Sequence, residues 1–164
     1  MNYLQLLESK FYKDTQSLVL QRAIWQKANK TVIFTNGCFD ILHKGHITYL
    51  AKAALLGDIL IIGLNDDYSV KAQQKDPNRP LQDESSRALV LSALLFVNAV
   101  ILFNQATPLE LIKLLTPDIL VKGSDYKLKD IVGAKEVLAY GGRVETIELV
   151  AGYSTTAIAK KMVK

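Results

Sequence analysis

The sequence predicts an α/β fold built on one parallel sheet, and two observations about its apolar residues support this. After residue 30, five short apolar runs alternate with five helical segments, an order typical of a parallel sheet with helices on both faces. The first four runs are nearly continuous in Val, Ile, Leu and Phe, as in strands that are buried on both sides. The 164 residues have the length of one domain. We therefore expect a Rossmann-like, doubly wound, five-stranded parallel sheet in one domain spanning residues 1–164.

The first 30 residues predict a helical extension ahead of this sheet. Leu4, Leu7 and Phe11 recur at three- and four-residue spacing, as do apolar residues between positions 18 and 24, which is typical of amphipathic helices. Asp14 and Thr15 can end one helix and cap the next. We expect one or two helices over residues 3–28, which either cover the sheet or contribute to a dimer interface.

Strands and helices of the main body follow in alternation. The five expected strands are residues 31–35, 59–64, 99–103, 119–121 and 144–149. The five expected helices are residues 46–56, 85–96, 108–115, 130–140 and 155–163. Thr107 is a good N-cap for the third helix, with Pro108 at its first helical position. The only long irregular segment is 71–84, and a loop of that length in a compact domain is often functional.

Composition and charge exclude several classes of protein. The single cysteine, Cys38, cannot form an internal disulfide, which fits a reducing cytoplasm. No apolar run reaches the ~18 residues of a membrane span, and no secretory signal follows Met1, so we expect a cytoplasmic protein with no membrane partner. Residues 1–30 contain five basic and two acidic side chains, so most of the net charge of +4 lies there. The nearly neutral main body lacks the concentrated basic face of a nucleic-acid-binding protein, and we expect no nucleic-acid partner.

The turn after the first expected strand carries the strongest chemical signal. It reads Thr-Asn-Gly-Cys-Phe-Asp-Ile-Leu-His-Lys-Gly-His over residues 35–46. On a helix, His43 and His46 share one face with a rise of ~4.5 Å between them. Gly45 lets a ligand approach the backbone, and the free N–H groups at a helix N-terminus favour an anion. A phosphate group fits this arrangement best.

Two other interpretations of these histidines remain open from spacing alone. They could bind a metal ion, but they are the only histidines in the chain, so a third protein ligand would have to be a carboxylate or Cys38. They could also be surface residues without a ligand. We expect no metal ion held by a set of protein side chains.

Two motifs near opposite ends of the chain together resemble a known family. The string that ends in His43-Lys44-Gly45-His46 resembles the H-x-G-H signature of the nucleotidylyltransferase superfamily, and Ser154-Thr155-Thr156 resembles a second signature of that superfamily. Over about residues 10–164, the chain is similar to the adenylyltransferases that make ADP-heptose from heptose 1-phosphate. The segments that carry this similarity are 65–67, 79–80, 107–112, 117–126, 131–134 and 141–144.

This resemblance implies transfer of AMP from ATP to D-glycero-D-manno-heptose 1-phosphate, with release of pyrophosphate. It implies that His43, His46 and Lys122 are catalytic and that Asp40, Arg79 and Arg87 bind the acceptor. The nucleotide-binding residues that it implies are Thr35, Asn36, Gly37, Phe39, His43, His46, Asn65, Lys71, Lys75, Lys122, Gly123, Asp125, Ser154, Thr155 and Thr156. Mg²⁺ is expected with ATP, held mainly by phosphates and water, and a homodimer or larger homo-oligomer is expected.

Alternatives to these assignments remain open. The structural alternatives are a solvated ion pair for Lys122 and Asp125, surface exposure for Lys71 and Lys75, bracing of the loop by Arg79 and Arg87, and bracing of the turn by Asp40. The chain also resembles glycerol-phosphate cytidylyltransferases, which carry Arg-Thr where Leu149 and Val150 stand here. This difference favours ATP over CTP. The alternative functions are a cytidylyltransferase acting on glycerol phosphate or a similar polyol phosphate, a nucleotide-binding module without catalysis, and a metal-site protein.

Overall fold

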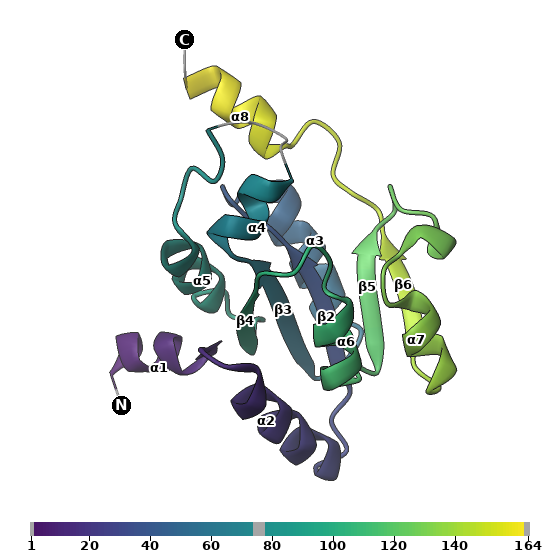
Figure 1. Ribbon diagram of the computed structural model, residues 1–164. Helices are drawn as coiled ribbons and strands as arrows, with labels where there is room; N and C mark the ends of the chain where they lie inside the picture. The colour runs from purple at the N-terminus through teal and green to yellow at the C-terminus, as the bar shows by residue number, and fades with distance from the viewer. Residues whose placement is uncertain (1, 74–77, 163–164) are drawn as a thin grey trace.

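The computed structural model describes residues 2–73 and 78–162, and it has the expected α/β architecture (Figure 1). Its elements in chain order are α1 (Tyr3–Ser9), β1 (Phe11–Tyr12), α2 (Thr15–Lys27), β2 (Val32–Gly37), α3 (Lys44–Ala54), β3 (Ile59–Asn65), α4 (Asp67–Ala72), α5 (Glu84–Ser92), β4 (Ala99–Phe103), α6 (Leu109–Leu115), β5 (Ile119–Gly123), the 3₁₀ helix η1 (Leu128–Asp130), α7 (Ala134–Ala139), β6 (Arg143–Ile147) and α8 (Thr155–Met162).

All strand pairs of the sheet are parallel, in the order β1-β4-β3-β2-β5-β6. The strand order reverses at β2, which has β3 on one side and β5 on the other. In open α/β sheets, ligands bind at the carboxyl ends of the strands where the order reverses. This topology therefore directs attention to the ends of β2 and β5.

The sheet of the described residues has six strands, so the prediction of five strands was wrong by one. The additional strand, β1, lies at the edge beside β4, with Phe11 opposite Val100. The backbone N–H of Val100 donates to the carbonyl oxygen of Lys10 at 2.8 Å. A two-residue strand has no periodicity of its own, so the sequence pattern places Phe11 on a helical face instead. The predicted break at Asp14 is confirmed, because its carboxylate caps α2 through the N–H of Ser17.

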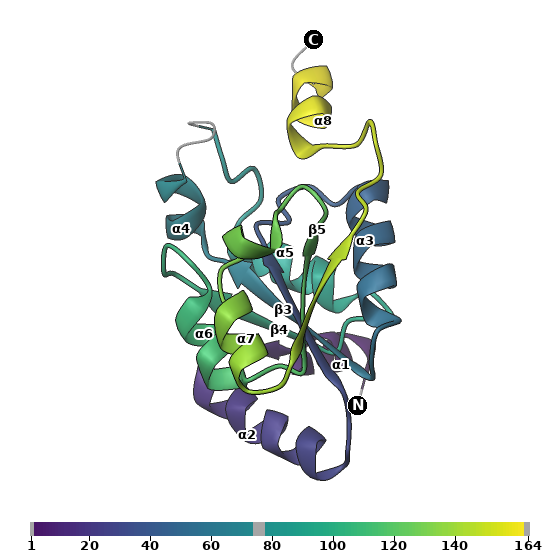
Figure 2. The same ribbon diagram turned by 90° about the vertical axis from the view of Figure 1, so that its right-hand side faces the viewer.

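Helices cover both faces of the sheet (Figure 2). On one face, α3 and α5 pack through Leu50 and Leu91 against a core that includes Ile33. On the other face, α2, α6 and α7 pack against a core that includes Val32 and Phe34. Neighbouring residues of β2 thus point to opposite cores, as a pleated strand requires, and this explains the continuous apolar runs.

Several boundaries differ from the prediction for local reasons. The segment predicted to be irregular begins inside α4, which Asp66 caps by accepting from the N–H of Ser69 at 2.7 Å. The helix predicted over 130–140 is divided into η1 and α7 by Gly133, whose φ is +86°. Pro108 is the N-cap of α6, in place of Thr107, and provides no side-chain cap. β6 ends at Ile147, two residues before the predicted end.

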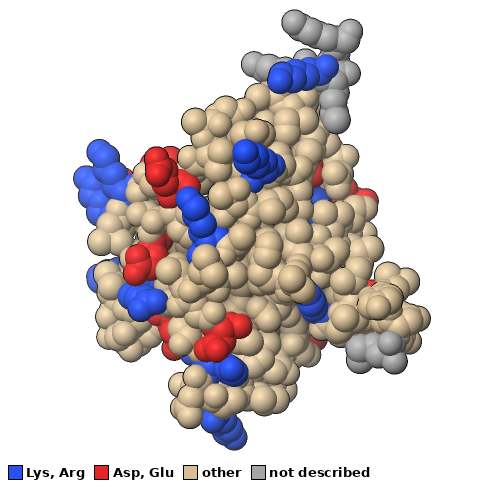
Figure 3. Space-filling view, turned by 180° about the vertical axis from the view of Figure 1, so that it is seen from behind, with Lys and Arg blue, Asp and Glu red and all other residues tan. Residues whose placement is uncertain are grey.

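Helix α8 lies beyond the carboxyl ends of the strands and projects from the body of the molecule (Figures 1 and 2). None of the helices in the described part of the chain is long and apolar enough to cross a membrane. Seen from behind, basic and acidic side chains are scattered over the surface with many uncharged residues between them (Figure 3).

Candidate active site

A pocket of about 470 Å³ opens at the carboxyl ends of β2 and β5. Three segments that are far apart in the sequence form most of it: the β2–α3 turn, the end of β5 and the segment leading into α8. Arg79 contributes from the loop before α5. The lining residues are Asn36, Gly37, Cys38, Phe39, His43, Gly45, His46, Tyr49, Arg79, Lys122, Gly123, Asp125, Tyr126, Leu149, Val150, Tyr153, Ser154, Thr155 and Thr156.

The two histidines lie together at the start of α3. His43 is the N-cap, and its Nδ1 accepts a hydrogen bond from the backbone N–H of His46 at 3.4 Å. Their rings are stacked, with centroids 3.8 Å apart and an angle of 19° between the planes. Because Nδ1 of His43 is an acceptor, the neutral ring carries its proton on Nε2. This nitrogen is a hydrogen-bond donor of the kind that a phosphate oxygen needs.

Burial keeps both imidazoles neutral at physiological pH. Desolvation lowers the pKa of His43. Desolvation and then the neighbouring His43 lower the pKa of His46 from its ordinary value of 6.5 to about 4. Two imidazolium ions this close would repel each other and would lose hydration. The pair therefore offers N–H donors without a net charge.

Positive charge comes from Lys122, at the end of β5. Its ammonium group contacts Oδ1 of Asn36 and lies 5.7 Å from the centre of the Tyr126 ring. Desolvation lowers the pKa of Lys122 to about 8, although Asp125 opposes this shift. That pKa is still above 7, so the group remains mainly protonated at neutral pH. Lys122 therefore presents a partly desolvated cation to the pocket.

The N-terminus of α8 also lines the pocket, beside the histidine turn. Ser154 caps this helix, its Oγ accepting from the N–H of Ala157 at 3.1 Å. The Tyr153 ring lies 6.3 Å from the His43 ring, and the ammonium group of Lys44 lies 5.7 Å from the centre of the Tyr153 ring. The N-termini of α3 and α8 thus line one pocket, and both are suited to binding an anion.

Residues of the β2–α3 turn adopt the special conformations that this arrangement requires. Phe39 has a φ of 44°, which is unusual for a bulky residue, and its ring packs edge-on against His46 at 5.3 Å. A Cβ on Gly37 would lie 3.0 Å from the Phe39 ring, and a Cβ on Gly45 would lie 3.0 Å from the His43 ring. Glycines at 37 and 45 therefore allow both rings to pack closely on the backbone.

The sequence model of the cytidylyltransferase-like family matches residues 34–161, which include every segment that lines this pocket. The chain belongs to the cytidylyltransferase-like family. The superfamily resemblance carried by the histidine motif and by Ser154-Thr155-Thr156 is confirmed by this match.

Bacterial relatives of this cytidylyltransferase-like chain are about half identical to it. "Bifunctional protein HldE" of Syntrophotalea carbinolica is 53% identical over 137 residues, which are 84% of this chain and 28% of that protein. The protein of the same name in Campylobacter jejuni is 50% identical over 155 residues, which are 94% of this chain and 32% of that protein. The chain thus spans about a third or less of the length of these curated relatives.

Solved structures of similar fold include the lipopolysaccharide core biosynthesis protein from Thermoplasma volcanium. It has a TM-score of 0.60 and 29% identity, over 74% of this chain and 97% of the other. Pantoate-beta-alanine ligase from Francisella tularensis has a TM-score of 0.62 at 14% identity, over 93% of this chain and 77% of the other. This second likeness supports the fold alone.

The structure brings most of the predicted site residues of this cytidylyltransferase-like domain together. Those that line the pocket are Asn36, Gly37, Phe39, His43, His46, Arg79, Lys122, Gly123, Asp125, Ser154, Thr155 and Thr156. The sequence predicts that the histidine turn and the segment before α8 meet, and in the structure both segments line this pocket.

Other predicted site residues do not line the pocket. Thr35 is fully buried, and its hydroxyl is hydrogen-bonded to Tyr49 at 2.8 Å. Asn65 is buried and donates to Ser69 at 3.2 Å. Lys71 is exposed near the end of α4. Asp40, within the turn, and Arg87, on α5, are both buried, and Lys75 lies outside the described residues.

Sequence reasoning gave no role to Tyr49, Tyr126 or Tyr153, all of which line the pocket. Tyr126 and Tyr153 each follow an expected strand by a few residues, which was the only available signal. Tyr49 lies one helical turn after His46, so its position on the same face of α3 follows from helix periodicity.

Proposed function

We propose that this chain transfers AMP from ATP to heptose 1-phosphate, most specifically D-glycero-D-manno-heptose 1-phosphate, giving ADP-heptose and pyrophosphate. The observation that carries the proposal is the meeting of His43, His46 and Lys122 with the N-terminus of α8 around one pocket. The similarity to lipopolysaccharide core and HldE proteins supports a sugar-phosphate acceptor.

In this reaction, an oxygen of the sugar phosphate attacks the α-phosphorus of ATP. The bond from that phosphorus to the bridging oxygen breaks, and pyrophosphate leaves with the electron pair. Negative charge builds on the oxygens of the transferring group, so hydrogen-bond donors held at that place lower the barrier. The imidazoles of His43 and His46 provide neutral donors, and Lys122 provides a cation. Ser154, Thr155 and the free N–H groups of α8 hold the phosphates that depart.

The nucleobase is proposed to be adenine. Leu149 and Val150 line the pocket at the positions where related glycerol-phosphate cytidylyltransferases carry Arg-Thr. The side chains at these positions therefore lack the hydrogen-bonding groups that Arg and Thr provide in those enzymes, and this difference favours ATP over CTP. The Tyr126 ring also lines the pocket and is suited to stacking on a purine.

Mg²⁺ is proposed as the companion of ATP. Asp125 is the carboxylate among the described lining residues, and the described residues contain no group of three or more metal-binding side chains. Phosphate oxygens, water and one carboxylate are a donor set that Mg²⁺ accepts. Bound there, the ion would neutralise phosphate charge, while the chain's own groups orient the triphosphate.

The acceptor phosphate is proposed to meet Arg79, whose planar guanidinium suits phosphate oxygens. Its Nε lies 3.7 Å from Oδ2 of Asp40, so a buried carboxylate holds it at the pocket. A cytoplasmic location and a homodimer or larger oligomer are further parts of this proposal, and light scattering on the purified protein tests the oligomer.

A substrate panel tests the proposed reaction. Pyrophosphate release is measured with ATP or CTP, each combined with heptose 1-phosphate or glycerol 3-phosphate. Release that requires ATP and heptose 1-phosphate supports the proposal. Release only with CTP and glycerol 3-phosphate would establish the cytidylyltransferase alternative, and tight ATP binding without turnover on any acceptor would indicate a non-catalytic module.

A further inference from the structure

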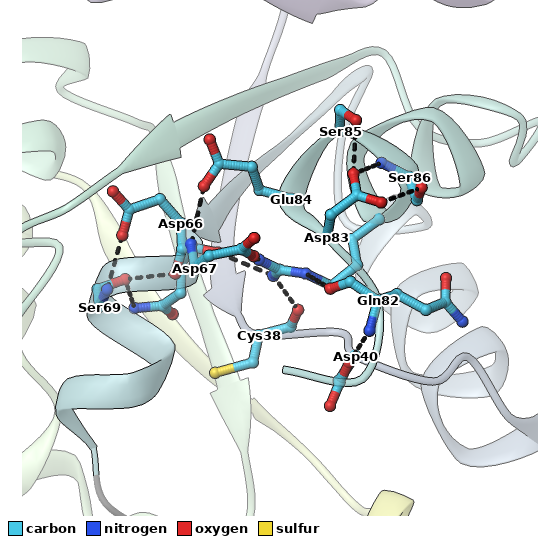
Figure 4. Close-up of polar contacts among 12 residues, drawn as sticks. Cys38, Asp40, Asp66, Asp67, Ser69, Gln82, Asp83, Glu84, Ser85 and Ser86 are labelled. Carbon is cyan, nitrogen blue, oxygen red and sulfur yellow. Dashed lines mark hydrogen bonds and ion pairs between the residues drawn. The ribbon is translucent and has the colours of Figure 1, made fainter. Parts of the chain in front are cut away.

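A buried arginine, Arg87 of α5, ties three segments of the chain together beneath the pocket. It is 1% exposed, and its guanidinium donates to the carbonyl oxygens of Cys38 at 2.7 Å, Asn65 at 2.8 Å and Gln82 at 3.0 Å. It also donates to the carboxylate of Asp67 at 2.7 Å. Figure 4 shows Cys38, Asp67 and Gln82 converging on this point from separate segments.

The segments held by Arg87 lie at the carboxyl ends of the strands, where the pocket opens. Cys38 lies in the β2–α3 turn between two pocket-lining residues, Gly37 and Phe39. Asn65 ends β3, and Gln82 belongs to the loop before α5, which also carries Arg79. The orientation of the histidine turn thus depends on a residue that is far from it in sequence.

Asp40 holds the same loop from the other side. It is 2% exposed, and its Oδ1 accepts from the backbone N–H groups of Leu81 at 2.8 Å and Gln82 at 3.0 Å. Gln82 is therefore fixed at both ends of its backbone, with its N–H bound to Asp40 and its carbonyl bound to Arg87. The other oxygen of Asp40 faces Arg79.

The geometry leaves Arg87 no part in direct substrate binding. Nε, Nη1 and Nη2 all donate to protein oxygens, and the side chain is fully buried. Arg87 is not among the pocket-lining residues. To touch a sugar phosphate, it would have to abandon backbone carbonyls that would then be buried without partners, at a penalty of about 1–3 kcal/mol each.

We propose that Arg87 and Asp40 are positioning residues that fix the histidine turn and the Arg79 loop relative to each other at the pocket. Where it concerns turnover, this inference rests on the proposed adenylyl transfer, because the two loops would carry the groups that meet ATP and the acceptor. A planar guanidinium with five donors can hold several carbonyls from different segments at once, whereas an ammonium group at the end of a flexible chain cannot.

The test compares Arg87→Lys with a matched control, Arg22→Lys. Arg22 is also buried, at 5% exposure, and donates to Thr116 and Asp118. Asp118 directly precedes β5, at the end of the sheet opposite the pocket. Both changes replace a buried guanidinium by an ammonium group, so both lower stability, but only the first loosens the histidine turn. Asp67→Asn is a milder second variant that weakens one partner of Arg87 without removing the guanidinium.

The first measurement is the rate at which a thiol reagent modifies Cys38, the only cysteine. Arg87→Lys is expected to change this rate several-fold, Asp67→Asn less, and Arg22→Lys not at all. This measurement needs no activity, so it decides the positioning role even if the proposed reaction fails. An unchanged rate in Arg87→Lys would overturn the inference.

The second measurement separates kcat from KM. A turn displaced by about 1 Å is expected to lower kcat by about 100-fold, with smaller changes in KM for ATP and heptose 1-phosphate. Arg22→Lys is expected to keep kcat at a temperature where it is folded. A raised KM for the sugar phosphate at unchanged kcat would instead make Arg87 a direct acceptor ligand, and equal losses in both variants would make its role purely structural.

Discussion

Replacing Tyr49 by phenylalanine tests how α3 is attached to the sheet. The Tyr49 hydroxyl donates to the carbonyl oxygen of Val121 at 3.1 Å and is 2.8 Å from Oγ1 of Thr35. Since its single hydrogen is directed to Val121, the Thr35 hydroxyl donates to Tyr49. Desolvation raises the pKa of Tyr49, so the hydroxyl remains a donor at every physiological pH. One side chain thus connects α3 with both β2 and β5.

The expected effect follows from what the substitution leaves behind. Thr35 is 0% exposed and Tyr49 is 8% exposed, so water cannot replace the lost hydroxyl without entering the core. Leaving a buried hydroxyl without its partner costs about 1–3 kcal/mol. For a chain of this length, a loss of about 2 kcal/mol lowers the melting temperature by about 4–8 °C. The activity should also fall, because His46 lies one turn earlier on the same helix.

Thermal unfolding followed by circular dichroism measures this loss, with Tyr140→Phe as the control. The Tyr140 hydroxyl donates to the carbonyl oxygen of Pro117 at 3.0 Å, but this residue is 42% exposed, so water can take over. Adding Thr35→Val to Tyr49→Phe removes the unpaired hydroxyl and should recover part of the lost stability. If Tyr49→Phe melted like the wild type, the hydroxyl chain would not hold α3, and the reasoning would be refuted.

Three further predictions concern the histidine pair. His46→Ala is expected to lower turnover by orders of magnitude with little change in urea-induced unfolding, and a loss of stability large enough to account for the lost activity would make His46 structural instead. Gly45→Ala is expected to raise KM for ATP, because the new Cβ would lie 3.0 Å from the His43 ring and 3.2 Å from Cβ of Tyr153. Unchanged kinetics would show that the His43 ring has room to move. The pKa of His46 is lowered to about 4 from 6.5, so the unfolded chain binds the proton first. The free energy of unfolding should therefore decline as the pH falls from 6.5 and level off below about 4, and His46→Gln should flatten this decline in urea titrations at each pH.

Much of the fold and the centre of the site could be predicted because both depend on rules that act locally. Continuous apolar runs such as 59–64 indicate buried strands without any knowledge of tertiary structure. Carboxyl ends of parallel strands share one edge of a sheet, so the turns after 31–35 and 144–149 could be expected to meet. The histidines and Ser154 are on these turns, and they line the same pocket.

Elements that lack a local pattern could not be predicted. β1 has two residues and exists because β4 offers a free edge. The capping of α4 by Asp66 is a local signal, but α4 is too short for its apolar period to be recognised. The role of Arg87 could not be assigned from sequence, because an arginine that binds phosphate and one that binds backbone carbonyls look the same in sequence. Only the four protein oxygens around it distinguish the two roles.

Charge and hydrogen bonding are provided by different residues in this pocket, and burial explains the division. Protonating both imidazoles, stacked at 3.8 Å, would cost free energy through charge repulsion, so His43 and His46 act as neutral donors in a rigid pair. Lys122 retains its proton at neutral pH even after partial desolvation, because its pKa falls only to about 8. A triphosphate needs both kinds of group: cations to offset its charge, and donors held in place so that no reorganisation accompanies bond breaking. Arg87 and Asp40, which touch neither substrate in this proposal, hold the histidine turn and the Arg79 loop, and so keep the imidazole donors and the Arg79 guanidinium at a constant separation.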